Sequence, residues 1–330
     1  MQSKFKSSED RTVRLSIITP TLNRNFIFQA WESLEKQTCK DFEWIIIDNG
    51  STPKHWLDLT KIRDSASFNV ILTKESQRGP AAARRKGENI ATGNYISYLD
   101  DDDLYSNDVV ESWLSDFSKN DSDISLLKDC KLFFDIYFFR IYIPNENNNR
   151  LECLLNKTEQ IKLPFTHSFV RFAYKKSLSE KSGSWNPTLT SREDIEYTLK
   201  IFLSEPKLTI AKGGTYYIRR ENIVKYENKE AFESVLNSYK HILKYVRGHK
   251  CEQDVKKRLA QDAKIKWEKV SLLFPDIGEK YAEFVSSNGL KCTKPLLIRK
   301  ITRLIKTPFR RIALLGELFC YISMLIKRYK

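Results

Sequence analysis

Tyr95-Ile-Ser-Tyr-Leu-Asp-Asp-Asp-Asp103 is an apolar run that leads directly into four consecutive acidic residues. A short run of aromatic and aliphatic residues predicts a buried strand, so the acidic residues would follow its carboxyl end. Side chains two residues apart on an extended segment point the same way, and Asp100 and Asp102 can therefore converge on one ligand. Because carboxylates this close repel one another, we expect a divalent cation, Mn²⁺ or Mg²⁺, as their partner. The alternative is a solvated acidic turn before a helix that begins near Ser106.

Three more apolar runs precede this one, and helix-like segments separate all four. The strands are expected at 14–19, 42–47, 69–73 and 95–99, and the helices at 26–37, 53–64 and 80–91. This alternation predicts an α/β fold with a mainly parallel central sheet that is covered on both faces. Ligands of such sheets bind beyond the carboxyl ends of the strands. Neither a G-x-G-x-x-G fingerprint nor a P-loop motif is present, which argues against a dehydrogenase and a P-loop ATPase.

The remaining sequence predicts a more varied second half. We expect a helix over 106–117, strand material over 123–143, a polar loop at 145–149, a helix over 191–202, and two short strands, 208–210 and 216–219, around Gly213-Gly214. From residue 228 onward the pattern is helical. The expected organisation is a flexible tail (1–12), an α/β domain (13–226), a helical region (227–290) and a basic tail (291–330).

The composition excludes several classes of protein. The 330 residues are 41% hydrophobic and 30% charged, which excludes wholesale disorder and collagen-like repeats. The six cysteines form no C-x-x-C pair, so neither a zinc ribbon nor a dithiol redox site is indicated. Residues 1–14 contain no apolar segment of a secretory signal, and we expect residence in the cytoplasm.

Most of the net charge of +14 lies in residues 291–330, which hold eleven basic residues and one acidic residue. At helical spacing, apolar side chains at 297, 298, 301, 304, 305 and 309 face away from basic side chains at 299, 303, 306 and 310. This pattern is typical of a helix that lies in a membrane interface, so we expect peripheral attachment to an anionic membrane on its cytoplasmic side. The following apolar run, 312–326, is too short to span a bilayer. The alternatives are a helix packed on the α/β domain and a nucleic-acid-binding tail.

Polar residues also occur at two other positions near the expected sheet edge. Asp48-Asn49-Gly50-Ser51-Thr52 follows the second strand, and its carboxylate and amide could bond a base or ribose, although a turn with a helix cap is an equal explanation. Gln77 to Arg85 places cations at a helix start, which suits a diphosphate, although a solvated helix face is the commoner role of such arginines.

Five segments in order carry a family resemblance: Ser16-Ile-Ile-Thr-Pro-Thr-Leu-Asn-Arg24, Ser33-Leu-Glu-Lys-Gln-Thr38, Asp41-Phe-Glu-Trp-Ile-Ile-Ile-Asp-Asn-Gly-Ser-Thr52, residues 79–85, and Ala91-Thr-Gly-Asn-Tyr-Ile-Ser-Tyr-Leu-Asp-Asp-Asp-Asp103. Over residues 14–103 the chain resembles the family 2 glycosyltransferases. These enzymes use nucleotide sugars, have a GT-A fold and invert the anomeric centre. Beyond Asp103 the resemblance is limited to Ser191-Arg-Glu-Asp-Ile-Glu196.

The resemblance implies a role for each matching residue. Asn49 would face the base from a position where the family usually has Asp, Asp102 would bind the metal, and Arg85 replaces a usual Asn. Asp194, with Glu193 beside it, would be the base that removes the proton of the acceptor hydroxyl, although Ser191 and Asp194 also fit a helix capping box. The nucleotide-sugar site would consist of Pro20, Thr21, Asn23, Asp48, Asn49, Arg84, Asp100 and Asp101.

The sequence therefore predicts a metal-dependent inverting glycosyltransferase that uses a nucleotide-diphosphate sugar, with UDP as the expected nucleotide. The acceptor would be a glycan or a lipid-linked saccharide, as in bacterial surface polysaccharide synthesis. The rivals are a nucleotidyltransferase, which would need the carboxylates and the cation but not Asp194, and a non-enzymatic nucleic-acid-binding protein, which would leave the acidic strand end unexplained.

Overall fold

The parallel sheet expected from the first hundred residues is present in the computed structural model, which describes residues 14–136, 139–144, 171–219 and 228–291. Strands β1 (Leu15–Thr21), β2 (Phe42–Asp48), β3 (Asn69–Lys74) and β4 (Tyr95–Tyr98) pair in parallel in the order β3-β2-β1-β4. The chain moves outward from β1 to β3 and then returns to the other side of β1. Ligand crevices of open α/β sheets form at such a reversal, which here lies between β1 and β4.

The sheet continues beyond β4 with mixed strand directions. Strands β8 (Phe172–Lys175), β6 (Ile124–Ile136), β9 (Leu208–Arg219) and β5 (Leu104–Tyr105) follow in that order, and β7 (Phe139–Pro144) pairs with β6. β4 and β8 are antiparallel, whereas β6 and β9 are parallel. The expected α/β architecture is therefore confirmed.

The expectation of two short strands around Gly213-Gly214 is wrong, because residues 208–219 form the single strand β9. Gly214 has a φ of 82°, and a Cβ atom there would lie 2.7 Å from Cδ2 of Leu127. The register of β6 against β9 shifts between Leu127 and Asp129, as in a β-bulge. A glycine in a strand often marks a bulge or a close approach of another segment, and here it does both.

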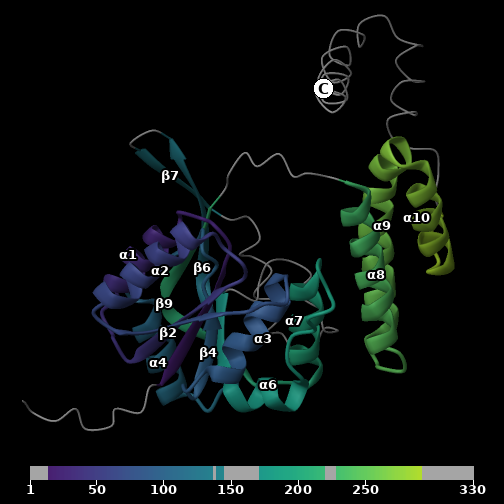
Figure 1. Ribbon diagram of the computed structural model, residues 1–330. Coiled ribbons are helices and arrows are strands. Elements are labelled where there is room, and N and C mark those ends of the chain that lie inside the picture. Colours follow the sequence, from purple (N-terminus) through teal and green to yellow (C-terminus); the bar gives the residue numbers. More distant parts are fainter. Residues whose placement is uncertain (1–13, 137–138, 145–170, 220–227, 292–330) are drawn as a thin grey trace, which may run out of the picture. The chain divides into compact units, whose positions relative to one another are not determined.

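Helices cover both faces of the sheet, as Figure 1 shows. Helices α1 (Ile27–Glu35), α2 (Pro53–Ser65) and α4 (Val109–Lys119) lie on one face, and α3 (Pro80–Ile90), α6 (Lys176–Ser182) and α7 (Glu193–Leu203) lie on the other. The right-handed crossovers of parallel strands explain this distribution, because the chain reverses its direction across the sheet after β3.

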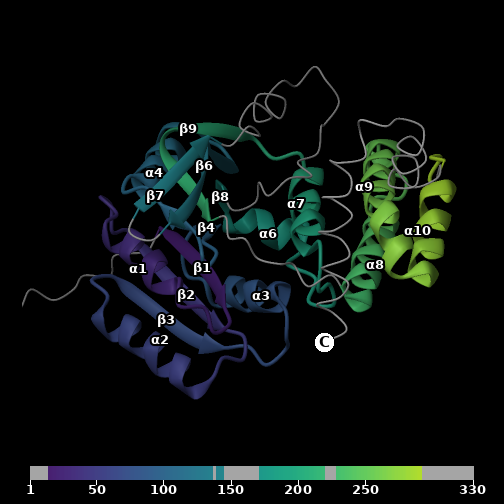
Figure 2. The same ribbon diagram turned by 90° about the horizontal axis from the view of Figure 1, so that it is seen from above.

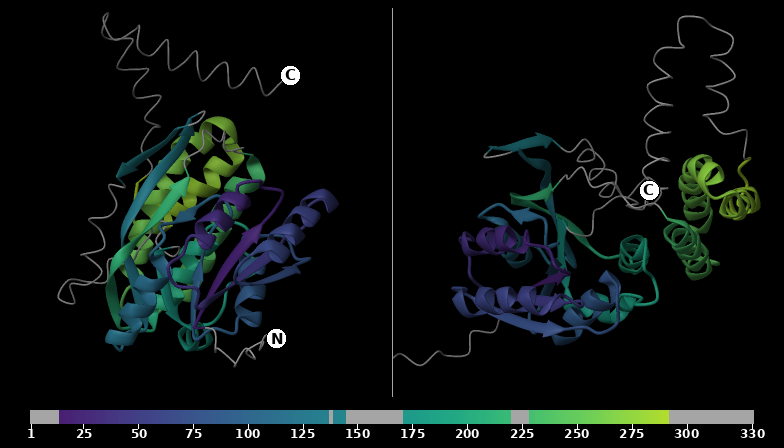
Figure 3. Two further views of the ribbon diagram at one scale, coloured as in Figure 1. Left: turned by 90° about the vertical axis from the view of Figure 1, so that its left-hand side faces the viewer. Right: turned by 45° about the horizontal axis from the view of Figure 1, so that its top comes forward.

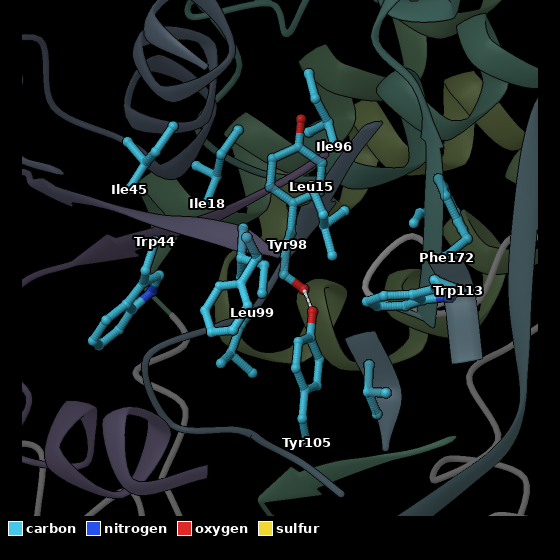
Figure 4. Close-up of a cluster of buried hydrophobic side chains, with 14 of the residues drawn as sticks. Leu15, Ile18, Trp44, Ile45, Ile96, Tyr98, Leu99, Tyr105, Trp113 and Phe172 are labelled. Carbon is cyan, nitrogen blue, oxygen red and sulfur yellow. Dashed lines mark hydrogen bonds between the residues drawn. The ribbon is translucent and has the colours of Figure 1, made fainter. Parts of the chain in front are cut away.

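The core of this unit fixes the ends of β1, β2 and β4. Trp44 donates from Nε1 to Oγ1 of Thr19 at 2.8 Å, and Thr19 donates to the carbonyl oxygen of Leu99 at 2.6 Å. Figure 4 shows the hydroxyl of Tyr105 directed at the main-chain oxygen of Tyr98, which it bonds at 2.9 Å. All these side chains are buried. The backbone that carries the acidic residues is therefore held from two neighbouring strands.

The chain divides into two compact units, Met1–Tyr226 and Glu227–Lys330. The described part of the second unit contains α8 (Lys229–Tyr245), α9 (Glu252–Leu273) and α10 (Pro275–Ser287), which confirms the expected helical region (Figures 2 and 3). Its core includes Phe232, Tyr239 and Tyr281. None of the helices in the described residues has both the length and the apolar character needed to cross a membrane. Predictions for 1–12, 145–149 and 292–330 lie outside the described residues.

We expect Gly87→Ala to destabilise the first unit. Gly87 lies in α3 against β1, and an added Cβ would overlap Cγ2 of Ile18, which is fully buried and cannot move aside. Overpacking of a core typically costs about 1–3 kcal/mol. Urea unfolding of parent and variant checks this value. Combining the variant with Ile18→Ala removes the overlapping group, so the two effects should be less than additive. Full additivity would contradict the proposed overlap.

Candidate functional site

The ends of β1 and β4 are joined by a buried hydrogen bond. Thr21, the last residue of β1, donates from Oγ1 to Oδ2 of Asp101 at 2.7 Å. Arg24, three residues further, lies 2.5 Å from Oδ2 of Asp102 and 3.4 Å from Oδ1 of Asp101. The β1 end that was expected to line a nucleotide pocket, including Pro20, is therefore next to the acidic strand end.

The acidic residues lie in a crowded and mostly buried environment. Burial raises the pKa of Asp101 to about 7, although Thr21 and Arg24 act in the opposite direction. Burial and the neighbouring charge of Asp100 also raise the pKa values of Asp102 and Asp103. The acidic residues therefore do not form the solvated turn that was the alternative expectation. Four carboxyl groups in this environment favour a cationic partner.

Asp103 differs from its neighbours because its carboxylate is used within the fold. It accepts a hydrogen bond from the hydroxyl of Tyr216 at 2.7 Å and one from the backbone N–H of Arg219 at 2.8 Å. Arg219 also donates from Nε to the carbonyl oxygen of Asp102 at 3.0 Å. Asp103 and β9 thus hold the backbone of the acidic segment in position.

The loop after β2 lies beside the loop after β1. Asn23 has a left-handed φ of 55°, and its backbone N–H donates to Oγ of Ser51 at 3.0 Å. Its side-chain oxygen accepts a hydrogen bond from the N–H of Thr52 at 2.8 Å. Asp48 is buried and accepts from the N–H of Ser51 at 2.9 Å. The two loops that were expected to bind the nucleotide thus form one connected edge.

Asn49 uses its side chain to hold a third loop. Its Nδ2 donates to the carbonyl oxygens of Glu75 and Gln77 at 3.1 and 2.8 Å, and its Oδ1 accepts from the N–H of Gly79 at 2.8 Å. The structure therefore gives Asn49 a positioning role at the start of α3. Direct contact of its amide with a base stays a prediction.

Arg84 connects the acidic strand end to α7. Its guanidinium donates to Oδ1 of Asp100 at 2.8 Å and to Oε1 of Glu193 at 3.2 Å, and it lies over the ring of Trp185, 4.8 Å from the centroid. Burial acts to lower the pKa of this guanidinium, but the two carboxylates raise it overall. Arg84 is thus a structural cation, and it is not the solvated helix residue that was the alternative expectation.

The acidic motif at 191–196 lies at the first turn of α7, as expected. The residue before this helix, Arg192, has a left-handed φ of 59° and makes no side-chain capping bond, so the N-cap is not Ser191, as the alternative of a capping box required. Burial raises the pKa of Glu193, although Arg84 opposes this shift. Asp194 follows and is half-buried. Arg84 holds Glu193, and it also bonds Asp100 in the acidic edge, which is the run of residues 100–103 after β4. The candidate base Asp194 therefore lies next to a residue that is held at the acidic edge.

A buried polar network fixes the same two helices one turn further along. Glu88, four residues after Arg84 on α3, accepts hydrogen bonds from the hydroxyls of Tyr98 and Tyr174 at 2.7 and 2.8 Å. It also accepts from Tyr197 of α7 and from Ser184. Trp185 stacks on Tyr197 and donates to the hydroxyl of Tyr98 at 2.7 Å, so it is a core residue.

Several of these residues were not predicted as parts of the site. Arg24 lies inside the quoted motif, and its spacing of three residues from Thr21 is the signal that could have assigned it. Asp103 and Arg219 depend on a strand pairing that the sequence pattern does not reveal. Glu88 could have been suspected, since its spacing of four from Arg84 puts both on one face of a helix.

The acidic edge suits a hard divalent cation. Asp100 and Asp102 offer carboxylate oxygens, and Mg²⁺-type sites use one or two such groups together with substrate phosphates. Within the described residues, no group of three or more His, Cys, Asp or Glu side chains is placed so that it could hold a metal ion. Asp100 and Asp102 alone would leave coordination positions open to phosphate oxygens of a substrate.

The fold of this chain is similar to that of proteins with solved structures. Structures of S. aureus TarS 1-349 in complex with UDP-GlcNAc and of GalNAc-T7 with UDP, GalNAc and Mn²⁺ share the fold. The TM-score is 0.56 for both, at 19% and 16% identity. The matches cover 75% of this chain and 71% of the TarS 1-349 chain, and 86% of this chain and 55% of the GalNAc-T7 chain.

Sequence relatives include two uncharacterized glycosyltransferases. EpsJ of Bacillus subtilis is 26% identical over 215 residues, which cover 63% of this chain and 61% of EpsJ. A protein of Haemophilus influenzae is 30% identical over 222 residues, which cover 63% of this chain and 70% of that protein. The family model "Glycosyl transferase family 2" matches residues 16–181, which include the whole acidic edge. The chain therefore belongs to glycosyl transferase family 2.

Proposed function

We propose that the protein transfers a sugar from a nucleotide-diphosphate sugar, with UDP as the nucleotide, to a hydroxyl of a glycan or lipid-linked saccharide, with inversion at the anomeric carbon. The observation that carries this proposal is the position of Arg84, which bonds Asp100 on one side and Glu193 on the other. It brings the start of α7 to the acidic edge of the sheet. A transferase needs both a donor-binding edge and a base on the acceptor side, whereas a nucleotidyltransferase needs only the first.

The site residues divide into donor-binding and proton-accepting groups. Pro20, Thr21, Asn23 and Asp48 would line the nucleotide pocket, as the connected loops of β1 and β2 support. Asp194 would accept the proton of the acceptor hydroxyl as its oxygen attacks the anomeric carbon opposite the leaving diphosphate. Arg84 would hold both groups at a constant separation. Setting such a geometry in advance lowers the entropic cost of reaction.

A divalent cation, Mn²⁺ or Mg²⁺, would be held by Asp102 with Asp100 nearby. When bound, it would supply positive charge that stabilises the leaving diphosphate. The GalNAc-T7 structure contains Mn²⁺ with UDP, which supports this choice of ion. Arg24 is already paired with Asp102, so the ion would replace this pairing and leave the guanidinium available for a phosphate oxygen.

Asp102→Asn should remove the enhancement of nucleotide binding by Mn²⁺, because the variant lacks the charge that holds the ion. Titration calorimetry of UDP with and without Mn²⁺ measures this effect. Asp64→Asn, which changes an exposed carboxylate on α2, is the matched control and should keep the enhancement. Arg24→Ala provides an opposite test: it removes the competing cation, so Mn²⁺ affinity without nucleotide should rise. Equal enhancement in parent and Asp102→Asn would overturn the metal assignment.

Asp194→Asn should keep donor binding and lose transfer, because an amide preserves the shape of the side chain but cannot accept the proton. General bases typically contribute 10²- to 10⁴-fold in rate, so we expect a decrease in this range. Single-turnover transfer and UDP-sugar binding are measured on the same preparation. Glu180→Gln, an exposed change on α6, serves as the control. Transfer within about threefold of the parent would leave Asp194 with a role only in the helix dipole.

We also propose that residues 291–330 attach the protein to the cytoplasmic face of an anionic membrane. The support is their concentration of basic charge opposite apolar positions. Replacing Arg299, Arg303, Lys306 and Arg310 by Gln should reduce co-sedimentation with phosphatidylglycerol vesicles without changing UDP binding. Each such charge near an anionic surface is worth about 1 kcal/mol. A parent protein that does not sediment with the vesicles would refute the attachment.

A further inference from the structure

A groove in the second unit gathers basic side chains from all three of its helices. It has a volume of about 420 Å³, which is within the size range of small-molecule sites. Lys240, Lys244 and Arg247 line it from α8 and the turn after it, Lys256 from α9 and Lys280 from α10. Cations therefore outnumber the two carboxylates of the groove, Glu252 and Glu283.

The five cations are not equivalent. Lys256 pairs with Glu252 at 2.6 Å, and Lys280 pairs with Glu233 at 2.7 Å. Lys240, Lys244 and Arg247 make no ion pair with any residue that the structure describes. Lys240 and Lys244 lie about one turn, or about 6 Å, apart on α8, and Arg247 follows in the turn after the helix, where it lines the same groove. The helix dipole explains one cation near the end of α8, but it does not explain three that face one groove.

This arrangement is unfavourable for the protein alone. Like charges four residues apart on a helix, as Lys240 and Lys244 are, destabilise it by a few tenths of a kcal/mol. Among the carboxylates of the groove, Glu252 attracts Arg247 but forms its ion pair with Lys256. An anion that spans the three side chains would remove this repulsion. Lys240 and Lys244 are already about 6 Å apart along the helix, and Arg247 lies beyond them, which indicates a ligand with more than one anionic group.

The remaining residues that line the groove indicate a ligand with other polar groups besides phosphate. Glu283, Ser287 and Asn288 add hydrogen-bonding groups from the end of α10. The carboxylate of Glu283 accepts bonds from hydroxyl groups and repels a phosphate, whereas Ser287 and Asn288 can bond either group. A flat lipid surface would not fill a groove. Hydroxyl groups alternating with phosphates fit the lining best.

We infer that this groove binds a saccharide or polyol chain that carries repeated phosphate groups, and that this chain is the acceptor or part of it. The role of this chain as the acceptor rests on the proposed function, whereas its binding in the groove needs no donor and no catalysis. The second unit would then supply acceptor affinity through residues that take no part in the transfer step.

The test measures binding of a glycerol phosphate hexamer to the full-length protein by titration calorimetry. Maltohexaose is the neutral chain of similar length, and inorganic phosphate is the isolated anion. The hexamer should bind, phosphate should bind more weakly by tenfold or more, and maltohexaose should not bind measurably. Added salt should weaken binding of the hexamer, because exposed charges are screened. Equal affinity for phosphate and hexamer would overturn the inference.

Variants locate the site. The double variant Lys244→Glu and Arg247→Glu should lower hexamer affinity by about tenfold or more, since bonds to charged groups contribute strongly. Lys257→Glu, an exposed change on α9 outside the groove, should bind like the parent. UDP binding should be the same in all three proteins, which separates failure of this inference from failure of the donor site. Unchanged hexamer affinity in the double variant would refute the groove as the site.

Two further ligands distinguish other anion sources. The parent and the double variant should co-sediment equally with phosphatidylglycerol vesicles, because the membrane contact proposed above involves residues 291–330. Loss of sedimentation in the double variant would assign the groove to lipid and overturn the inference. A single-stranded oligo-dT of equal charge should bind at least tenfold more weakly than the hexamer. Equal binding would indicate a general polyanion surface and would also overturn it.

Discussion

The buried guanidinium of Arg84 is the interaction on which the rest of the site depends. A charge in the interior is costly unless it is paired on all sides. Asp100, Glu193 and the face of Trp185 surround this cation, and each comes from a different part of the chain. Because removal of one partner would leave the others buried and uncompensated, the strand end, α3 and the start of α7 behave as a single structural element.

The crowded carboxylates and the loops around them show a second constraint. Asp103 and Asn49 lie among residues expected to touch a ligand, yet their hydrogen bonds serve mainly to hold backbone segments. Asp102 and Asp100 are held instead by arginine side chains. Residues of the same type, adjacent in the sequence, thus divide into some that build the site and others that are available to a substrate.

Much of the first unit could be predicted from local patterns. The strand ending at Tyr98 and the acidic segment after it follow from apolar periodicity and the two-residue alternation of a strand. The contact of Arg84 with Glu193 could not be predicted, since it joins residues 109 apart. The single strand β9 was missed because paired glycines are usual in turns, and only pairing with β6 reveals the bulge. Helix α7 begins after Arg192 and not after Ser191, so its N-cap differs from the one that the alternative of a capping box required.

The Glu88 network has a consequence for how such an enzyme can change. Arg84 and Glu88 lie one turn apart on α3, and each of them bonds the region of α7. A helix attached at one point can pivot, whereas one attached at two points keeps its direction as well as its distance. Substitutions elsewhere in the chain can therefore alter what is recognised without altering the alignment of Asp194 with the sheet edge. The geometry of the reaction can thus stay the same while the substrate changes.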